Sequence, residues 1–179
     1  MPLQISDSRR QTGAGRLLDS PGATLEAAVT GDRPAFEAAW RGYAARLADA
    51  AGLALPVRAS REFSAGLSLA VSAPEDALYA AAELNEAAAR LAHTDVSGEP
   101  AEEPFADAAE RIRLLADRER DPALVALLRA AEARGVPALW DADAVTLGLG
   151  AGGHTWHARS LPDPAAVDWD TLSSVPVAL

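Results

Sequence analysis

The chain has 179 residues, a formal net charge of −10 at pH 7, nearly half apolar residues and no cysteine. This length fits one domain, or one domain with a tail, and allows a substantial core. The absence of cysteine excludes disulfides, thiolate metal sites and cysteine nucleophiles. The acidic balance argues against a nucleic acid as the main partner, because binding phosphates requires a basic face.

All 16 basic side chains are arginines, and the chain contains no lysine. This excludes a phosphate-binding loop that ends in Gly-Lys-Thr or Gly-Lys-Ser, a Schiff-base lysine and a lysine general base. No apolar run reaches membrane-spanning length, and the first residues lack the basic region and hydrophobic stretch of a signal peptide. We therefore expect a cytoplasmic protein without a membrane partner.

The first half of the sequence predicts strands around one long helix. Residues 3–8 alternate between apolar and polar, whereas residues 16–30 leave a short strand and a helical turn as open alternatives. Asp32 is a good N-cap before Pro34, and Gly52 is a good C-cap. The expected elements are strands over 3–8, 53–61 and 67–72, the last two forming a hairpin, and a helix over 32–51.

The second half is predominantly helical. The Pro74-Glu75-Asp76 run begins a helix that continues to about His93, with alanines on its apolar face. A polar, acidic loop follows over 94–104. We expect further helices over 105–118 and 121–134, and strands over 136–140 and 144–148. This order predicts an α+β fold with a mixed, mainly antiparallel sheet and about four helices packed on it.

Two patterns near the end of the chain are candidates for binding sites. Gly148, Gly150 and Gly153 match G-x-G-x-x-G, but a strand-like run follows them where dinucleotide binding needs a helix, which favours a hairpin turn. His154 and His157 are three residues apart and lack a close third ligand, which favours two partly exposed histidines over a zinc site.

Two carboxylate pairs stand on predicted helices, namely Glu83 with Glu86 and Asp107 with Glu110. Such pairs bind Mg²⁺ or divide acid and base roles in some sites, but on solvent-facing helices they are usually surface. No catalytic constellation is visible, so we expect neither a catalytic nor a metal-binding residue in this chain.

The strongest candidate for a binding site is an arginine cluster at a glycine loop. Arg9, Arg10 and Arg16 surround Gly13 and Gly15 in an otherwise acidic chain. Guanidinium groups beside exposed backbone amides can hold a carboxylate or a phosphate. The alternative is a set of surface arginines that flank a turn. We assign these five residues as the expected substrate-binding residues.

Three stretches of the chain resemble the Mur ligase superfamily, most closely its cyanophycin-synthetase-like members. They are residues 147–179, ending in Val175-Pro-Val-Ala-Leu179; residues 8–18 with Pro21-Gly-Ala23; and residues 63–79. In those proteins the strand like 175–179 leads directly into the phosphate loop of an ATP-binding core. The relatives usually read Gly-Pro-Asn where this chain has Gly13-Ala14-Gly15.

The resemblance implies a non-catalytic part of an ATP-dependent carboxylate–amine ligase. Residues 1–162 would form an α+β accessory domain on the substrate side, and 163–179 a linker with the first strand of an ATP-binding domain outside this chain. ATP and Mg²⁺ would belong to that missing core, so no cofactor is expected here. The partner would be the ligase domain, in cis or in trans, and a homo-oligomer stays open. The alternative is a free-standing, non-enzymatic interaction domain that docks through its alanine-rich helix and acidic loop.

Overall fold

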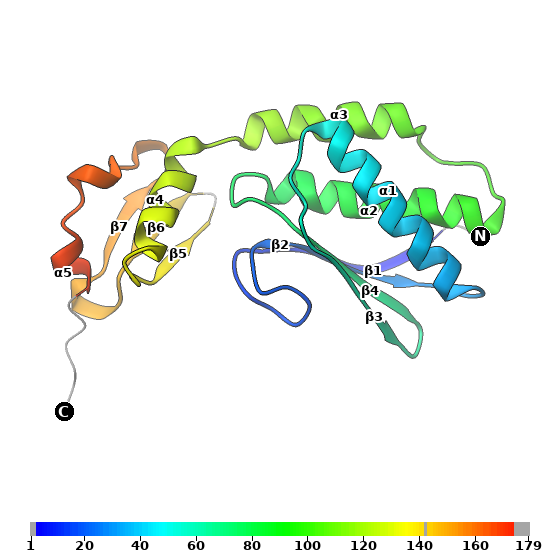
Figure 1. Ribbon diagram of the computed structural model, residues 1–179, viewed down its shortest axis with the longest axis horizontal. Coiled ribbons are helices and arrows are strands. Elements are labelled where there is room, and N and C mark those ends of the chain that lie inside the picture. Colours follow the sequence, from blue (N-terminus) through cyan, green and yellow to red (C-terminus); the bar gives the residue numbers. More distant parts are fainter. Residues whose placement is uncertain (1–2, 142, 174–179) are drawn as a thin grey trace. The chain divides into compact units, whose positions relative to one another are not determined.

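The computed structural model describes residues 3–141 and 143–173 and is shown in Figure 1. The chain divides into two compact units, Met1–Arg120 and Asp121–Leu179. Each unit combines helices with antiparallel strands, which confirms the α+β class. The described strands form two sheets where the sequence led us to expect one, and all their pairings are antiparallel. The division after residue 120 precedes the boundary that was expected at residue 162.

The first unit consists of a four-stranded sheet and three helices. Its elements in chain order are β1 (Gln4–Gln11), β2 (Gly22–Ala28), α1 (Arg33–Ala51), β3 (Arg58–Phe63), β4 (Gly66–Ser72), α2 (Leu78–Ser97) and α3 (Phe105–Glu119). The strand order is β1-β2-β4-β3, so β1 and β3 form the two edges. Figure 1 shows α1 and α2 on the same side of the sheet, and α3 packs against both helices.

The ends of α1 follow the signals in the sequence. The Asp32 carboxylate accepts a hydrogen bond of 2.9 Å from the backbone N–H of Ala35, and Pro34 occupies the first turn. Gly52 ends the helix in the left-handed region, with φ +67°. No helix in the described part of the chain, including the 20-residue α2, is long and apolar enough to cross a membrane.

The core of the first unit lies between the sheet and the two helices on it. Ala23, Leu25 and Ala27 alternate along β2 and are all buried, so their side chains point toward the helices. Alanines and leucines line the buried face of α2, where small side chains allow a close approach to the sheet. The alanine-rich face of α2 is therefore used inside the unit and is not the exposed docking surface that the interaction-domain alternative requires.

One buried amide joins both helices to the sheet. Asn85 of α2 is 1% exposed, and its Oδ1 accepts a hydrogen bond of 2.9 Å from the indole Nε1–H of Trp40 in α1. Its Nδ2 donates to the carbonyl oxygen of Leu69 in β4 at 3.1 Å and to that of Ala23 in β2 at 3.5 Å. Because an unpaired buried polar group is costly, these bonds fix the helices on the sheet in one arrangement.

Replacing Asn85 with leucine should lower the free energy of unfolding by about 2 to 3 kcal/mol, because the buried Trp40 N–H loses this acceptor. Urea unfolding followed by circular dichroism measures the change. A double-mutant cycle with Trp40→Phe is the control, since the two changes should be less than additive when they break the same bond. Additive effects would show that the Trp40–Asn85 bond is not what stabilises this contact.

A carboxylate of α1 ties the edge strand β3 to the helices. Glu37 Oε1 accepts hydrogen bonds from Ser60 Oγ at 2.6 Å and from Arg41 Nη2 at 2.8 Å. Arg41 also donates to the backbone carbonyl of Arg58. The hydrogen bond from Ser60, followed by that from Arg41, holds the pKa of Glu37 below its ordinary value.

The Glu37 network should make stability depend on pH. A carboxyl whose folded-state pKa lies below its unfolded value adds stability above the unfolded pKa and loses it as the pH falls through the folded pKa. The advantage of the native chain over a Glu37→Gln variant should therefore be greatest near neutral pH and should shrink below about pH 4. Urea unfolding of both proteins across this range measures it, and an advantage that grows on acidification would contradict the assignment.

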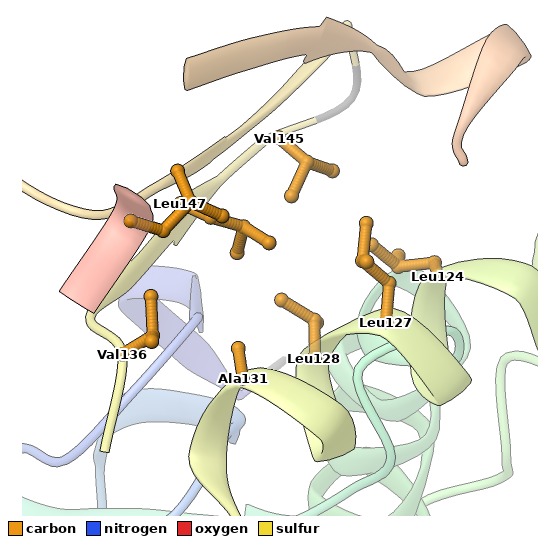
Figure 2. Close-up of a cluster of buried hydrophobic side chains, with 8 residues drawn as sticks. Leu124, Leu127, Leu128, Ala131, Val136, Val145 and Leu147 are labelled. Carbon is orange, nitrogen blue, oxygen red and sulfur yellow. The ribbon is translucent and has the colours of Figure 1, made fainter. Parts of the chain in front are cut away.

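The second unit is a small helix-on-sheet arrangement. Its elements are α4 (Pro122–Glu132), β5 (Ala138–Trp140), β6 (Ala144–Leu147), β7 (His154–His157) and α5 (Trp169–Ser173), with 3₁₀ turns at Gly150–Gly152, Ala158–Ser160 and Pro164–Ala166. The strand order is β5-β6-β7. Figure 2 shows Leu124, Leu127 and Leu128 of α4 facing Val145 and Leu147 of β6, which form the core of this unit.

The segment after residue 162 packs more closely than the sequence suggested. We expected 163–179 to be a poorly packed linker, but Leu172 is only 5% exposed and belongs to the core cluster of the second unit. Val167 and Trp169 pack against the same cluster, and Trp169 Nε1 donates to the Pro164 carbonyl at 2.9 Å. Residues 163–172 are thus part of this unit, while the expected strand 175–179 lies outside the described residues.

Candidate functional site

None of the three helices of the first unit lies on the face of the four-stranded sheet opposite α1 and α2 (Figure 1). Side chains alternate between the two faces of a strand, so the burial of Leu25 and Leu69 against the helices places their neighbours on the other face. These neighbours are small or polar, and Thr24 and Glu26 of β2 and Ser68 of β4 are partly exposed. We call this side of the sheet the open face.

The strand register aligns side chains in two rows across the open face, because directly opposed residues point to the same side. One row consists of Arg9, Thr24, Ala70 and Ala59. The next row consists of Asp7, Glu26, Ser68 and Arg61. Arginines therefore stand on both edge strands. Between them, Thr24, Ala70 and Ser68 form a floor of small side chains beside the carboxylate of Glu26.

The loop between β1 and β2 is held at one end of this face by Gln11. The Gln11 Nε2 donates to the backbone carbonyls of Gly13, of Leu18 at 3.4 Å and of Ser20 at 3.2 Å. The Gly15 N–H donates to the Leu18 carbonyl at 2.7 Å and closes the turn. A side chain at Gly15 would collide with the Gln11 amide, whose oxygen lies 2.3 Å from where a Cβ would stand. Glycine thus lets the loop fold back on Gln11.

The loop and the open face together enclose a hollow of about 710 Å³. Residues from all four strands and from the loop line it: Asp7, Arg9, Gln11, Gly15, Arg16, Leu17, Thr24, Leu25, Glu26, Arg61, Glu62, Phe63 and Ser68. A hollow of this size falls in the range of small-molecule binding sites.

The charges of the hollow are only partly neutralised. The Arg9 Nε donates to the Asp7 Oδ2 at 2.6 Å, and Glu62 pairs with Arg33 of α1. Within residues 3–141 and 143–173, neither Arg16 nor Arg61 forms an ion pair. Two guanidinium groups with unused donors therefore border the same space, where each can donate to a carboxylate or a phosphate.

Of the five expected substrate-binding residues, the structure brings together Arg9, Gly15 and Arg16, which all line the hollow. Gly13 is not part of the lining, and its carbonyl serves to anchor the loop on Gln11. Arg10 lies opposite Ala23 in the register and so points to the helix side of the sheet, away from Arg9. The three arginines that were expected to act together are therefore divided between the two faces of the sheet, with Arg9 and Arg16 at the hollow and Arg10 on the helix side.

Arg10 has a separate environment on the helix side. Its guanidinium carbon lies 3.5 Å from the centroid of the Tyr79 ring, a cation–π contact. Beside it, the Glu119 carboxylate accepts hydrogen bonds from the backbone N–H groups of Tyr79 at 2.7 Å and Ala80 at 2.6 Å. Burial raises the pKa of Glu119, against the opposing effect of these two bonds. Arg10 thus belongs to the contact between α2 and the end of α3.

The glycine motif and the histidines take the structures that the hairpin interpretation predicts. Gly148 and Gly150 have positive φ angles, and the strand β7 follows the turn directly. The ring of His154 packs on Trp156 with centroids 4.3 Å apart, and Nδ1 of His157 accepts from the backbone N–H of Arg159. No three His, Asp or Glu side chains within the described residues are grouped to hold a metal ion.

Glu83 and Glu86, the first of the two carboxylate pairs, and the acidic loop form ion pairs on the surface. Arg111 binds Glu83 of α2 and Glu103 of the loop between α2 and α3, the latter at 2.9 Å. Arg90 lies 3.6 Å from Glu86 and 3.4 Å from Glu102. These partly exposed pairs hold the loop on the two helices, and each contributes little to stability.

Sequence reasoning missed most residues of the hollow, among them Gln11, Glu26 and Arg61. The signal for Arg61 was present in the predicted hairpin, since alternation along 58–63 places Arg61 on the face opposite Ser60. Glu26 was missed because the segment that contains it was not assigned as a strand. The pairing of β1 with β2 across a long loop, on which the hollow depends, has no local sequence signal.

Comparison of the chain with known proteins finds no matching family model and no matching curated protein.

Proposed function

We propose that this chain is a non-catalytic accessory domain that binds the acidic substrate of an ATP-dependent amide-bond ligase of the Mur ligase type. The observation that carries the proposal is that the guanidinium groups of Arg16 and Arg61, which form no ion pair with any residue that the structure describes, border one hollow on the open face. The resemblance of residues 8–18, 63–79 and 147–179 to that superfamily supports the choice of ligase.

An arginine-lined hollow suits a carboxylate ligand for physical reasons. The guanidinium group presents its donors in a planar fork that matches the two oxygens of a carboxylate. It also keeps its charge at any physiological pH. The floor of small side chains, with Thr24 and Ser68 at its centre, leaves room for the ligand to reach both edge strands.

The proposal divides the reaction between two parts of a larger system. Such a ligase activates a carboxylate with ATP and passes the acyl group to an amine, which requires a phosphate-loop lysine. Since this chain has no lysine, an ATP-binding ligase domain in cis or in trans would supply that chemistry together with ATP and Mg²⁺. The cytoplasmic location expected from the sequence would supply the ATP, and it is part of this proposal.

Substitution of the two unpaired arginines should weaken the binding of an acidic ligand. Arg16→Ala and Arg61→Ala should each raise the dissociation constant of a fluorescent oligoglutamate peptide by about tenfold, because each removes charge-assisted hydrogen bonds. Fluorescence anisotropy at low salt measures the affinity, and melting curves check the fold.

The matched control is Arg10→Ala, which removes the same charge next to Arg9 but on the helix side of the sheet. This variant should keep the affinity of the native chain within about twofold, because an exposed charge on the other face of the sheet cannot donate to the ligand and acts on it only weakly through solvent. An Arg10→Ala variant that weakens the peptide as much as Arg16→Ala would show that net charge, and not the hollow, binds the ligand.

The chain on its own should not bind Mg-ATP with micromolar affinity. It has no lysine to contact the terminal phosphates, and its glycine motif over 148–153 leads into β7 and not into a helix. Isothermal titration calorimetry with Mg-ATP tests this expectation. A micromolar, saturable binding signal would overturn the proposed division of roles.

A further inference from the structure

The two edges of the four-stranded sheet differ in how they are protected. The backbone carbonyl of Arg58 in β3 accepts a hydrogen bond from Arg41, and that of Phe63 accepts one of 3.2 Å from Arg33. Both donors belong to α1, so arginine side chains cover this edge. Proteins commonly cover an edge strand in this way, because free backbone groups otherwise pair with another chain.

The backbone of the other edge strand, β1, receives no such side-chain hydrogen bond from the described part of the chain. Five of its eight residues are exposed, including the three consecutive residues Ser8, Arg9 and Arg10. Among the described residues, its backbone pairs only with β2. Alternate N–H and C=O groups of an edge strand point away from the sheet, where they can accept a further strand.

We propose that β1 pairs antiparallel with β1 of a second copy of this chain, which joins the two sheets into one of eight strands. The proposal does not depend on the binding of an acidic ligand. The partner is a second copy because the charges of β1 complement those of an identical strand that runs in the opposite direction.

Symmetry and charge together select one register for this pairing. A two-fold axis perpendicular to the sheet keeps both open faces on the same side, so only residues on the same face can oppose each other. With the axis at Ser8, Asp7 of each copy opposes Arg9 of the other, which gives two opposite-charge pairs. If the axis passed instead at Asp7 or at Arg9, that residue would lie opposite itself in the second copy, and two like charges would repel each other.

The local structure of β1 is compatible with that register. Its irregularity lies between Ile5 and Asp7, outside the three central positions Asp7, Ser8 and Arg9. Asp7 and Arg9 already form an ion pair within one copy. The register would therefore build a cluster of four alternating charges at the centre of the joined sheet. A single pair of edge strands buries little area, so we expect a weak dimer that dissociates on dilution.

Sedimentation equilibrium of the full chain, from low micromolar to near-millimolar concentration, tests the pairing. Asp7→Arg and Arg9→Asp should each raise the dimer dissociation constant by about tenfold or more, because each variant places two like charges opposite each other at both symmetric positions of the dimer. The double variant Asp7→Arg/Arg9→Asp restores opposite charges in the same register and should recover the native dissociation constant. Arg61→Asp, on the same face but on the covered edge strand β3, is the control that should leave it unchanged.

Introduced cysteines test the register independently, because the native chain contains none. On oxidation, Ser8→Cys should form a cross-linked dimer, since Ser8 opposes itself across the axis. Ser6→Cys should not, because it would oppose Arg10 of the second copy. A chain that remains monomeric at every concentration, a dimer insensitive to both single charge reversals, or a double variant no tighter than the singles would overturn the proposal.

Discussion

The arrangement of the first unit depends on the buried Asn85 amide, which holds Trp40 of α1 and the carbonyls of Leu69 and Ala23 at the same time. Apolar contacts alone would let the alanine-rich α2 slide on a flat sheet, since alanines offer little shape to interlock. A buried group that must be satisfied by partners on three elements removes that freedom. Both helices are thereby kept on one face of the sheet, and neither covers the other face.

Strand alternation then decides which charged residues act together. Arg9 and Arg10 are neighbours in sequence, yet one borders the hollow and the other stacks on Tyr79. Conversely, Arg9, Arg16 and Arg61 come from two strands and a loop and meet around one space. The loop reaches that space because Gln11 binds three of the backbone carbonyls that follow it. A site of this kind is built by register, and not by a linear motif.

The sequence predicted the elements that carry local signals. Asp32, Pro34 and Gly52 marked the ends of α1, and the glycine turn before β7 was recognised from the strand-like residues that follow it. Strand β2 was left undecided, because Pro21-Gly22 and a run of alanines fit more than one conformation. The start of α2 at Leu78, later than Pro74, and the burial of Leu172 depend on contacts distant in sequence. Only Arg9, Gly15 and Arg16 of the hollow were anticipated, because strand pairing supplies the rest.

The central claim is that an acidic ligand binds on the open face, and mapping by nuclear magnetic resonance tests it most directly. A ¹⁵N-labelled chain would be titrated with the oligoglutamate peptide while backbone amides and arginine Nε–H signals are followed. The account predicts saturable shifts at Arg9, Arg16, Arg61 and Ser68, with Arg10 and Tyr79 unchanged. Shifts concentrated at Arg10 and Tyr79, or no saturable shift on the open face, would contradict it.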